Sequence, residues 1–256
     1  MKIQFAGVGS AFTSADYYQT NAVVISESGK KLMIDCGGDA RFSLGEIGIG
    51  AADLDAVYIS HLHADHIGGL EWLGFSTYFN PNIPRPKLYC MDTLIEPLWG
   101  AIGPGLASIQ GKEMYLKSYF EPIAIHENGS FVWEDIKFTP VQTVHVMSEY
   151  TIKYSYGLLI RENGKNKPTV FYTADTQFCP HQIFDFYDRA DFIFHDCETS
   201  PFKSGVHSHY EDLCTLKDIV KDKIWLEHYQ PGTDDNEKAI KDGFLGFVKK
   251  GQTFEF

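Results

Sequence analysis

Residues 61–66, with the sequence His-Leu-His-Ala-Asp-His, hold four side chains that can ligate metal ions. In an extended loop, side chains two positions apart point the same way, so we expect His61 and His63 to converge on one ion while Asp65 and His66 turn toward another. Imidazole nitrogens and carboxylate oxygens suit Zn²⁺, and Mn²⁺, Fe²⁺ and Ni²⁺ accept the same atoms. The spacing therefore predicts one loop that holds two metal ions; the alternative is a solvated polar loop that contains three histidines.

The segments around this loop indicate how it is positioned. Strand-like runs joined by glycine turns occupy residues 3–8, 22–26, 32–35 and 56–60. The last run leads directly into His61, and apolar residues recur at three- and four-residue intervals after Gly68, which is typical of a helix. We therefore expect the metal loop to connect a strand to a helix.

The rest of the chain predicts a layered α/β fold. Further elements are expected as strands at 87–91, 131–141, 154–160, 169–173, 192–195 and 224–227, and as helices at 180–188 and 210–220. Strands in two runs with helices between them suggest two sheets packed face to face and covered by helices. No internal repeat, low-complexity segment or linker is recognisable, so residues 1–256 are predicted to form a single domain. The glycine-rich passage 100–111 has no readable structure and could be a cap or an oligomer contact.

Charge and composition restrict the partners of the protein. The 34 Asp and Glu against 22 Lys and Arg give a formal net charge of −12, and no Lys/Arg-rich run is present, so binding of long RNA or DNA is not expected. Five cysteines without a Cys-x-x-Cys pair suggest neither a disulfide framework nor a thiolate zinc site. The sequence contains no apolar stretch long enough to span a membrane and no signal-peptide pattern, so we expect a cytoplasmic protein.

The motif at residues 61–66 resembles, without a gap, the His-x-His-x-Asp-His motif of the metallo-β-lactamase superfamily, and the resemblance extends over nearly the whole chain. It implies the αββα four-layer sandwich of that fold and two zinc ions per chain, with manganese as an alternative. Three later family positions are matched by His145, Asp175 and His228. The resemblance implies two ligand sets bridged by Asp175, namely His61, His63 and His145 on one ion, and Asp65, His66 and His228 on the other.

Each later position is open to a plainer interpretation when it is taken alone. A single His near a strand end is more often a surface residue, and Asp175 could cap a turn or a helix. Their order after an intact motif favours the ligand interpretation. Asp35 matches a family Asp that orients the metal loop, and its alternative role is that of a turn residue ahead of Gly37 and Gly38.

Two zinc ions bridged by a carboxylate can activate water and stabilise a developing oxyanion, which defines a hydrolase but not its substrate. Residues 205–209 resemble the His-Ser-Thr element of the tRNase Z and cyclic-nucleotide phosphodiesterase branch, with His209 where Thr usually stands. Asp196 falls where that branch has a Glu. We therefore expect His207, held by Asp196, to protonate the leaving oxygen of a phosphodiester, and we place Asp65 among the catalytic residues as well as the ligands.

Other residues are alternatives for this proton transfer. His207 could instead cap the following helix while His209 is exposed, and Glu198 could replace Asp196 as the residue that orients the acid. Glu71, just beyond the motif, could face the site, although a helical Glu is ordinarily exposed. Which of His207, His209 and Glu71 delivers the proton stays open.

The spacing between two predicted ligands limits the substrate. The 29 residues between His145 and Asp175 are filled by apparent strands and a hairpin-like segment at 162–165, which leaves no room for the long basic arm with which tRNase Z grips tRNA. The chain therefore most resembles the compact anti-Pycsar phosphodiesterases of phages and bacteria. That resemblance implies hydrolysis of 3′,5′-cyclic mononucleotides, including cCMP and cUMP, to linear nucleoside monophosphates, which counteracts cyclic-nucleotide antiphage signalling.

The same resemblance implies a homodimer, in which the passage 100–119 could carry Tyr115 or Tyr119 over the nucleotide base; surface or core packing is the alternative for both. Three other functions fit the metal site. They are a tRNase Z-like RNA endonuclease, a lactonase or thioesterase in which a residue such as Tyr229 assists the oxyanion, and a non-catalytic cyclic-nucleotide sponge. Degraded members of enzyme families usually lose ligands, and none is missing here, which disfavours the sponge.

Overall fold

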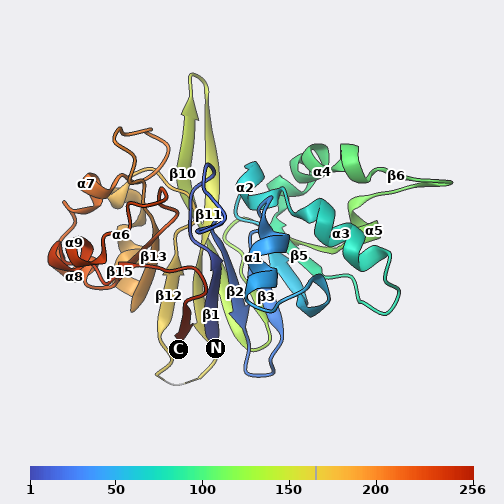
Figure 1. Ribbon diagram of the computed structural model, residues 1–256, viewed down its shortest axis with the longest axis horizontal. Coiled ribbons are helices and arrows are strands. Elements are labelled where there is room, and N and C mark those ends of the chain that lie inside the picture. The colour runs from blue at the N-terminus through green and yellow to red at the C-terminus, as the bar shows by residue number, and fades with distance from the viewer. Residues whose placement is uncertain (165) are drawn as a thin grey trace.

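Two seven-stranded sheets packed face to face form the centre of the computed structural model, which describes residues 1–164 and 166–256 (Figure 1). The first sheet consists, in spatial order, of β16 (Thr253–Glu255), β1 (Lys2–Gly7), β2 (Asn21–Ile25), β3 (Lys31–Ile34), β4 (Ala56–Tyr58), β5 (Lys87–Met91) and β8 (Glu121–Ile125). The second consists of β15 (Gly246–Phe247), β14 (Ile224–Glu227), β13 (Phe192–Asp196), β12 (Thr169–Tyr172), β11 (Thr151–Glu162), β10 (Ile136–Ser148) and β9 (Phe131–Trp133).

Helices cover both outer faces of the paired sheets (Figure 1). Beside the first sheet lie α1 (Ala40–Glu46), the 3₁₀ turn η1 (Ala51–Asp53), α3 (Leu70–Tyr78), α4 (Asp92–Leu106) and α5 (Leu116–Tyr119). Beside the second lie α6 (Pro180–Arg189), α7 (Tyr210–Leu213), α8 (Asp218–Lys221) and α9 (Asn236–Lys241). This order of layers confirms the αββα four-layer sandwich of the metallo-β-lactamase fold.

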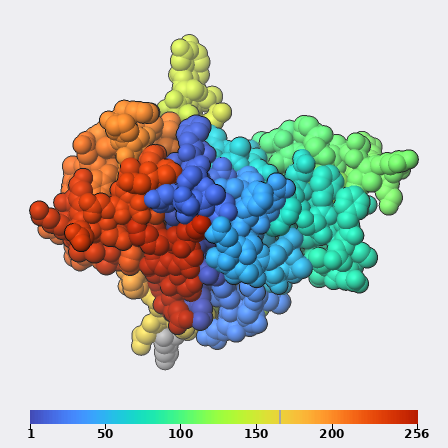
Figure 2. Space-filling view, viewed as in Figure 1, coloured from blue at the N-terminus to red at the C-terminus, as the bar shows by residue number. Residues whose placement is uncertain are grey.

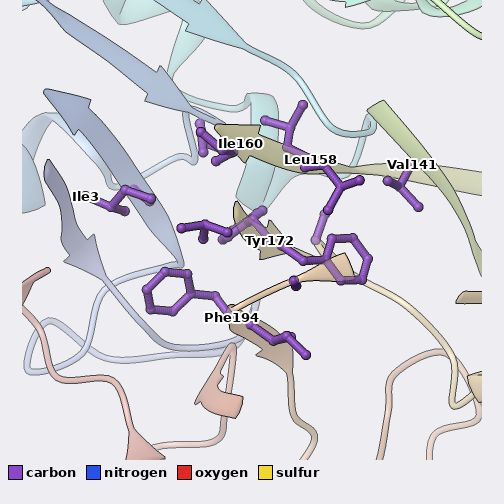
Figure 3. Packing of buried hydrophobic residues seen from close by; sticks show 14 of the residues in the cluster. Ile3, Val141, Leu158, Ile160, Tyr172 and Phe194 are labelled. Atoms are coloured by element: carbon purple, nitrogen blue, oxygen red, sulfur yellow. The ribbon is translucent and has the colours of Figure 1, made fainter. Parts of the chain in front are cut away.

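Strand residues alternate between two apolar clusters, because successive side chains of a strand point to opposite faces. In β2, Ala22 and Val24 join the cluster that fills the space between the sheets, whereas Val23 packs toward the helices over the first sheet. Figure 3 shows part of the inter-sheet cluster, where strands from both sheets contribute Ile3, Val141, Leu158, Ile160, Tyr172 and Phe194. Burial of each such aliphatic or Phe side chain stabilises the sandwich by about 1.5–3 kcal/mol.

The strand that leads into the metal loop is confirmed, but it ends earlier than expected. β4 ends at Tyr58, and a short helix, α2 (Ala64–Ile67), begins three residues after His61. The extended geometry therefore applies to His61 and His63 alone, while Asp65 and His66 lie in a helical turn. This corrects the expectation that the whole motif is extended.

Residues 131–141, predicted as one strand, form two. Glu134 and Asp135 have φ values of 48° and 61°, and they make the turn between β9 and β10. β10 then continues to Ser148, so His145 lies within a strand rather than after one. β10 and β11 form a hairpin that projects from the body at the top of Figures 1 and 2. Lys165, the end of the predicted 162–165 hairpin, lies outside the described residues.

Two further segments differ from expectation. The predicted helix 210–220 is divided into α7 and α8, whereas the helix predicted at 180–188 is α6. The glycine-rich passage 100–111 comprises the end of α4 and β6 (Ser108–Ile109), which forms a small hairpin with the following strand, β7 (Lys112–Glu113). Gly111, at its turn, has a φ of 80°, which glycine adopts without steric cost. This hairpin forms the projection at the right of Figure 2.

In the described part of the chain, no helix combines the length and the apolar character that crossing a bilayer requires. The expectation that residues 1–256 form a single domain stays a prediction.

Candidate metal centre

One group of donor atoms gathers beside the metal loop. His61, His63, His145 and Asp175 each present one ligand atom, and these atoms lie within 4.8 Å of one another. His61 is held by a hydrogen bond of 3.0 Å between its Nδ1 and the hydroxyl of Ser60. His63 is exposed, whereas the other three residues are buried. This group therefore opens toward solvent on the His63 side.

A β-bulge aims His145 at this group. Val144 pairs with Tyr154 and Val146 pairs with Lys153, so His145 is the extra residue of β10. Its Nδ1 lies 2.9 Å from the carbonyl oxygen of Val206, and a hydrogen bond there directs Nε2 into the site, where it lies 3.0 Å from His63 Nδ1. The sequence alone gave no sign of this bulge.

A second group consists of Asp65, His66, Asp175 and His228, all buried, again with ligand atoms within 4.8 Å of one another. The single turn of α2 places Asp65 and His66 side by side. His228 follows β14 in a left-handed conformation, with a φ of 62°, and its backbone N–H donates to the carbonyl of Val8 at 2.9 Å. Its Nε2 lies 3.4 Å from Asp65 Oδ2.

Asp175, which follows β12, stands between the two groups. Its Oδ2 lies 3.6 Å from the Nε2 of His61 and of His145 and 3.3 Å from the Nε2 of His66. Its Oδ1 lies 3.5 Å from the Nε2 of His228. One carboxylate thus faces ligands from both groups, which is the arrangement that a bridging ligand needs.

Asp35 holds the metal loop in place through hydrogen bonds. It is fully buried, and its Oδ2 lies 2.8 Å from His66 Nδ1. The backbone N–H and hydroxyl of Ser60 donate to its two oxygens at 2.8 and 2.7 Å. Asp35 therefore fixes both His66 and the residue before His61, which agrees with an orienting role.

The protonation states of the first donor group suit a divalent cation. Burial lowers the pKa of His61, His63 and His145, so these rings are neutral ligands. Burial alone would raise the pKa of Asp175, but charge on His228 and His66 lowers it well below its usual value, so the carboxylate is ionised. The buried Nε2 of His66 also has no hydrogen-bond partner. These residues are therefore able to hold a metal ion.

His207 and Asp196 form a pair next to both groups. His207 Nδ1 lies 3.0 Å from Asp196 Oδ2, and its ring lies 4.8 Å from that of His228 between centroids. Burial disfavours the charged imidazole, but the Asp196 carboxylate outweighs this effect and raises the pKa of His207. Burial also acts against ionised Asp196, yet His207 lowers the pKa of that carboxyl to about 2. The pair is therefore built to hold a proton on His207.

The residues considered as alternatives to His207 and Asp196 make other contacts. His209, not His207, caps α7: its Nδ1 accepts from the N–H of Glu211 at 3.3 Å, and its Nε2 lies 3.0 Å from the carbonyl of Ser200. His209 is also buried rather than exposed. Glu198 accepts hydrogen bonds from the Ser200 hydroxyl and the Ser204 N–H, and Asp196 is the carboxylate that contacts His207. Glu71 is exposed and lies against Gly105 of α4.

Two tyrosines do not have the roles proposed for them. Tyr119 is fully buried and donates from its hydroxyl to the carbonyl of Leu106 at 2.8 Å, so it is a packing residue and not a lid. Tyr229 is likewise buried and donates to the carbonyl of Val248 at 2.6 Å, so it offers nothing to an oxyanion. Tyr115 is 48% exposed and is available to a ligand or a partner.

A cavity of about 970 Å³ opens from the first donor group, between the start of α4 and the β10–β11 hairpin. Tyr154 and Tyr156 line it from alternate positions of β11, and Lys153 is the one Lys or Arg among its described lining residues. These three residues were not predicted from the sequence. The alternation of aromatic residues in a predicted strand was the available signal. The volume lies at the upper end of the range for small-molecule sites.

The paired sheets and the donors that they carry define a protein of the metallo-β-lactamase fold, and solved structures agree. The chain superposes on the metallo-β-lactamase fold protein YhfI from Bacillus subtilis with a TM-score of 0.77 and 23% identity, covering 100% of this chain and 98% of that one. A diphosphatase of the PhnP family gives a TM-score of 0.75 with 19% identity, covering 100% and 97%.

The family follows from the sequence matches. The family model "Anti-Pycsar protein Apyc1" matches residues 1–254. Relatives named Anti-Pycsar protein Apyc1 include one from Paenibacillus harenae, 34% identical over 100% of both chains. Another, from Bacillus phage vB_BveM-Goe7, is 32% identical over 98% of this chain and 96% of that relative. The chain belongs to the anti-Pycsar Apyc1 family.

Proposed function

We propose that the two donor groups hold two zinc ions, with manganese as a substitute, and that Asp175 bridges them. The donor set is rich in imidazole nitrogen with a few carboxylate oxygens, which suits zinc better than the harder Mg²⁺ or Ca²⁺. When bound, two such ions would supply Lewis acidity for activating water and for neutralising charge that develops on a phosphate. The ligands are His61, His63, Asp65, His66, His145, Asp175 and His228.

The reaction that this site serves is hydrolysis of 3′,5′-cyclic mononucleotides, including cCMP and cUMP, to linear nucleoside monophosphates. The observation that carries this proposal is the 3.0 Å contact between His207 and Asp196 beside both donor groups, in a chain of the anti-Pycsar family. Opening a cyclic phosphodiester leaves an alkoxide that needs a proton, and such acid catalysis contributes about 10²–10⁴-fold. In the cell, this activity would remove the nucleotide signal of an antiphage defence.

The residues of the chain divide the work. His207 donates the proton on its Nε2 to the leaving oxygen, while Asp196 holds Nδ1 and stabilises the charged ring. Asp65, ionised because His66 and His228 outweigh the effect of burial on its pKa, is placed to take up a proton from the attacking water. The cavity beside His63 and His145 receives the nucleoside, with Tyr154 and Tyr156 in its wall.

A substrate panel tests this proposal. Zinc- or manganese-loaded protein should open cyclic mononucleotides and leave a tRNA precursor intact, with cyclic dinucleotides as a further arm, followed by chromatography of the products. His207→Ala should lower kcat by about 10²–10⁴-fold. His209→Ala is the matched control, because His209 caps α7 and should lower stability by about 1 kcal/mol without changing the chemistry. A loaded protein that leaves every cyclic mononucleotide intact would falsify the proposal, and turnover of lactones or thioesters that survives His207→Ala would replace it.

We also propose a homodimer that works in the bacterial or phage-infected cytoplasm. The β6–β7 hairpin projects from the body, and Tyr115 beside it is exposed, as expected of a segment that reaches a second copy (Figure 2). Sedimentation equilibrium of the full chain should give twice the monomer mass. A monomer at micromolar concentration with full activity would contradict this part of the proposal.

A further inference from the structure

The strand that carries His145 has a free edge beside the metal site. β9 pairs with β10 only at Ile136, Lys137 and Phe138, and beyond that point no described strand pairs with β10 on the side away from β11. Backbone N–H and C=O groups at such an edge need other partners, and an unsupported edge is free to shift. The contacts that hold this edge therefore determine how firmly His145 is positioned.

Two glutamine side chains bind this unpaired edge of β10 where a neighbouring strand would otherwise pair with it. The carboxamide of Gln182, on α6, accepts from the N–H of Val144 and donates to the carbonyl of Gln142, both at 3.3 Å. Gln177 contacts the next residues along: its backbone N–H donates to the carbonyl of Val144 at 2.8 Å, and its side-chain Nε2 donates to the carbonyl of His145, also at 2.8 Å. The two side chains thus act as the peptide groups of a neighbouring strand would.

Gln177 is also tied to the rest of the site by its position in the chain. It lies two residues after Asp175, which faces both donor groups. Between them, Thr176 donates its backbone N–H to Asp196 Oδ2 at 2.8 Å. Three consecutive residues therefore serve three parts of the site. Asp175 faces both donor groups, Thr176 contacts Asp196, and Gln177 contacts the His145 bulge. A β-bulge is a local departure from regular pairing, so its geometry depends on such outside contacts.

We propose that Gln177 is a positioning residue, whose carboxamide fixes the His145 bulge and thereby the affinity of the His61–His63–His145 group for its metal ion. This inference rests on the proposed function, because it takes His145 as a ligand. Residues that orient metal ligands typically change metal affinity or activity by about 10–100-fold when they are replaced. Gln177 makes no direct contact with the ion in this scheme.

The test is a metal titration of Gln177→Leu, which removes the donor but keeps the side chain close in size. We expect one of two ions to bind about 10–100-fold more weakly, measured by competition with a chromophoric chelator, while the other ion is unaffected. The visible absorption of the cobalt-substituted protein should show the same loss at one site. Gln142→Leu is the matched control for metal binding, because no hydrogen bond involves its side chain among the described residues, and it should leave both affinities unchanged.

Urea unfolding of the metal-free variants separates positioning from folding. If Gln177→Leu does not fold, Gln177→Glu, which keeps the shape but sets a carboxylate oxygen against the His145 carbonyl, is titrated instead. Two ions bound with wild-type affinities by the folded variant would overturn the inference and leave the proposed function standing. A wild-type protein that binds no metal would instead overturn the proposed function.

Discussion

The two donor groups share Asp175 but differ in their surroundings. The His61–His63–His145 group borders the cavity and includes an exposed residue, whereas the Asp65–His66–His228 group is buried throughout. The open group is made of imidazoles apart from the shared Asp175. The buried group has a second carboxylate of its own, and Asp35 and Asp196 lie behind its two histidines.

This difference separates two tasks. The open group lies where a substrate can enter, so it is suited to contact the nucleotide. The buried group contributes Asp65 to the proposed chemistry, and it holds charged pairs in a low-dielectric interior, where they must be matched closely to be tolerated. Three predictions use this contrast.

Removing the shared carboxylate should have the largest effect, because it breaks both groups at once. Asp175→Ala is expected to lose most bound metal and to lower kcat/KM by about a thousandfold or more, since metal stabilisation of the transition state amounts to several kcal/mol. Elemental analysis of the purified protein and the cyclic-nucleotide assay measure this. Asp185→Ala, on the exposed face of α6, is the control and should match the wild type. A full metal complement in Asp175→Ala would show that the groups are not bridged through this residue.

Removing one histidine from each group should lower the free energy of unfolding by different amounts. His66→Ala leaves the buried Asp35 without the partner that lies 2.8 Å away, so we expect the metal-free protein to lose about 3–5 kcal/mol of unfolding free energy. His63→Ala should cost about 0.5 kcal/mol or less, because the residue is exposed. Urea unfolding measures both.

The His126–Asp92 pair provides the matched control for this comparison. Its Nδ1–Oδ2 distance is also 2.8 Å, but both side chains are exposed. His126→Ala should therefore cost less than about 1 kcal/mol. If His66→Ala and His126→Ala cost the same, burial is not what distinguishes the two donor groups.

The sequence predicted which donor residues lie together better than it predicted their surroundings. The motif at 61–66 was recognisable from its residue types and spacing, and the resemblance to the metallo-β-lactamase superfamily implied His145, Asp175 and His228, whose donor atoms the fold brings beside the motif. The layers followed from strand-like and helical segments. What failed was local geometry: the α2 turn and the division of 131–141 by Glu134 and Asp135.

The remaining errors have one physical origin, which is that side-chain direction depends on distant packing. The bulge at His145 is set by register with β11, which no local pattern specifies. Tyr229 and Tyr119 turn into the core because carbonyls of Val248 and Leu106 accept their hydroxyls. His209 is a separate case: it could not be recognised as a helix cap, because its residue type is not among those that usually cap helices.

The smallest predicted effect is a difference in how the two groups respond to acid. In the metal-free protein, burial lowers the pKa of the histidines in the open group, so a metal ion displaces no proton from them at neutral pH. Burial acts in the same direction on His66 and His228, but Asp175 and the other nearby carboxylates outweigh it and raise both pKa values well above the ordinary value. An ion that enters the buried group must therefore displace protons.

Metal affinity at the buried group should consequently fall on acidification, by about tenfold per pH unit for each displaced proton, while affinity at the open group stays nearly constant between pH 8 and pH 6.5. Zinc titrations with a competing chelator across this range should show the ratio of bound metal to protein declining from two toward one. Asp35→Asn removes one of the carboxylates that raise the pKa of His66, so it should make this decline shallower. Loss of both ions together, with one shared pH midpoint, would mean that the two groups titrate as a single unit and that the contrast between them does not extend to metal binding.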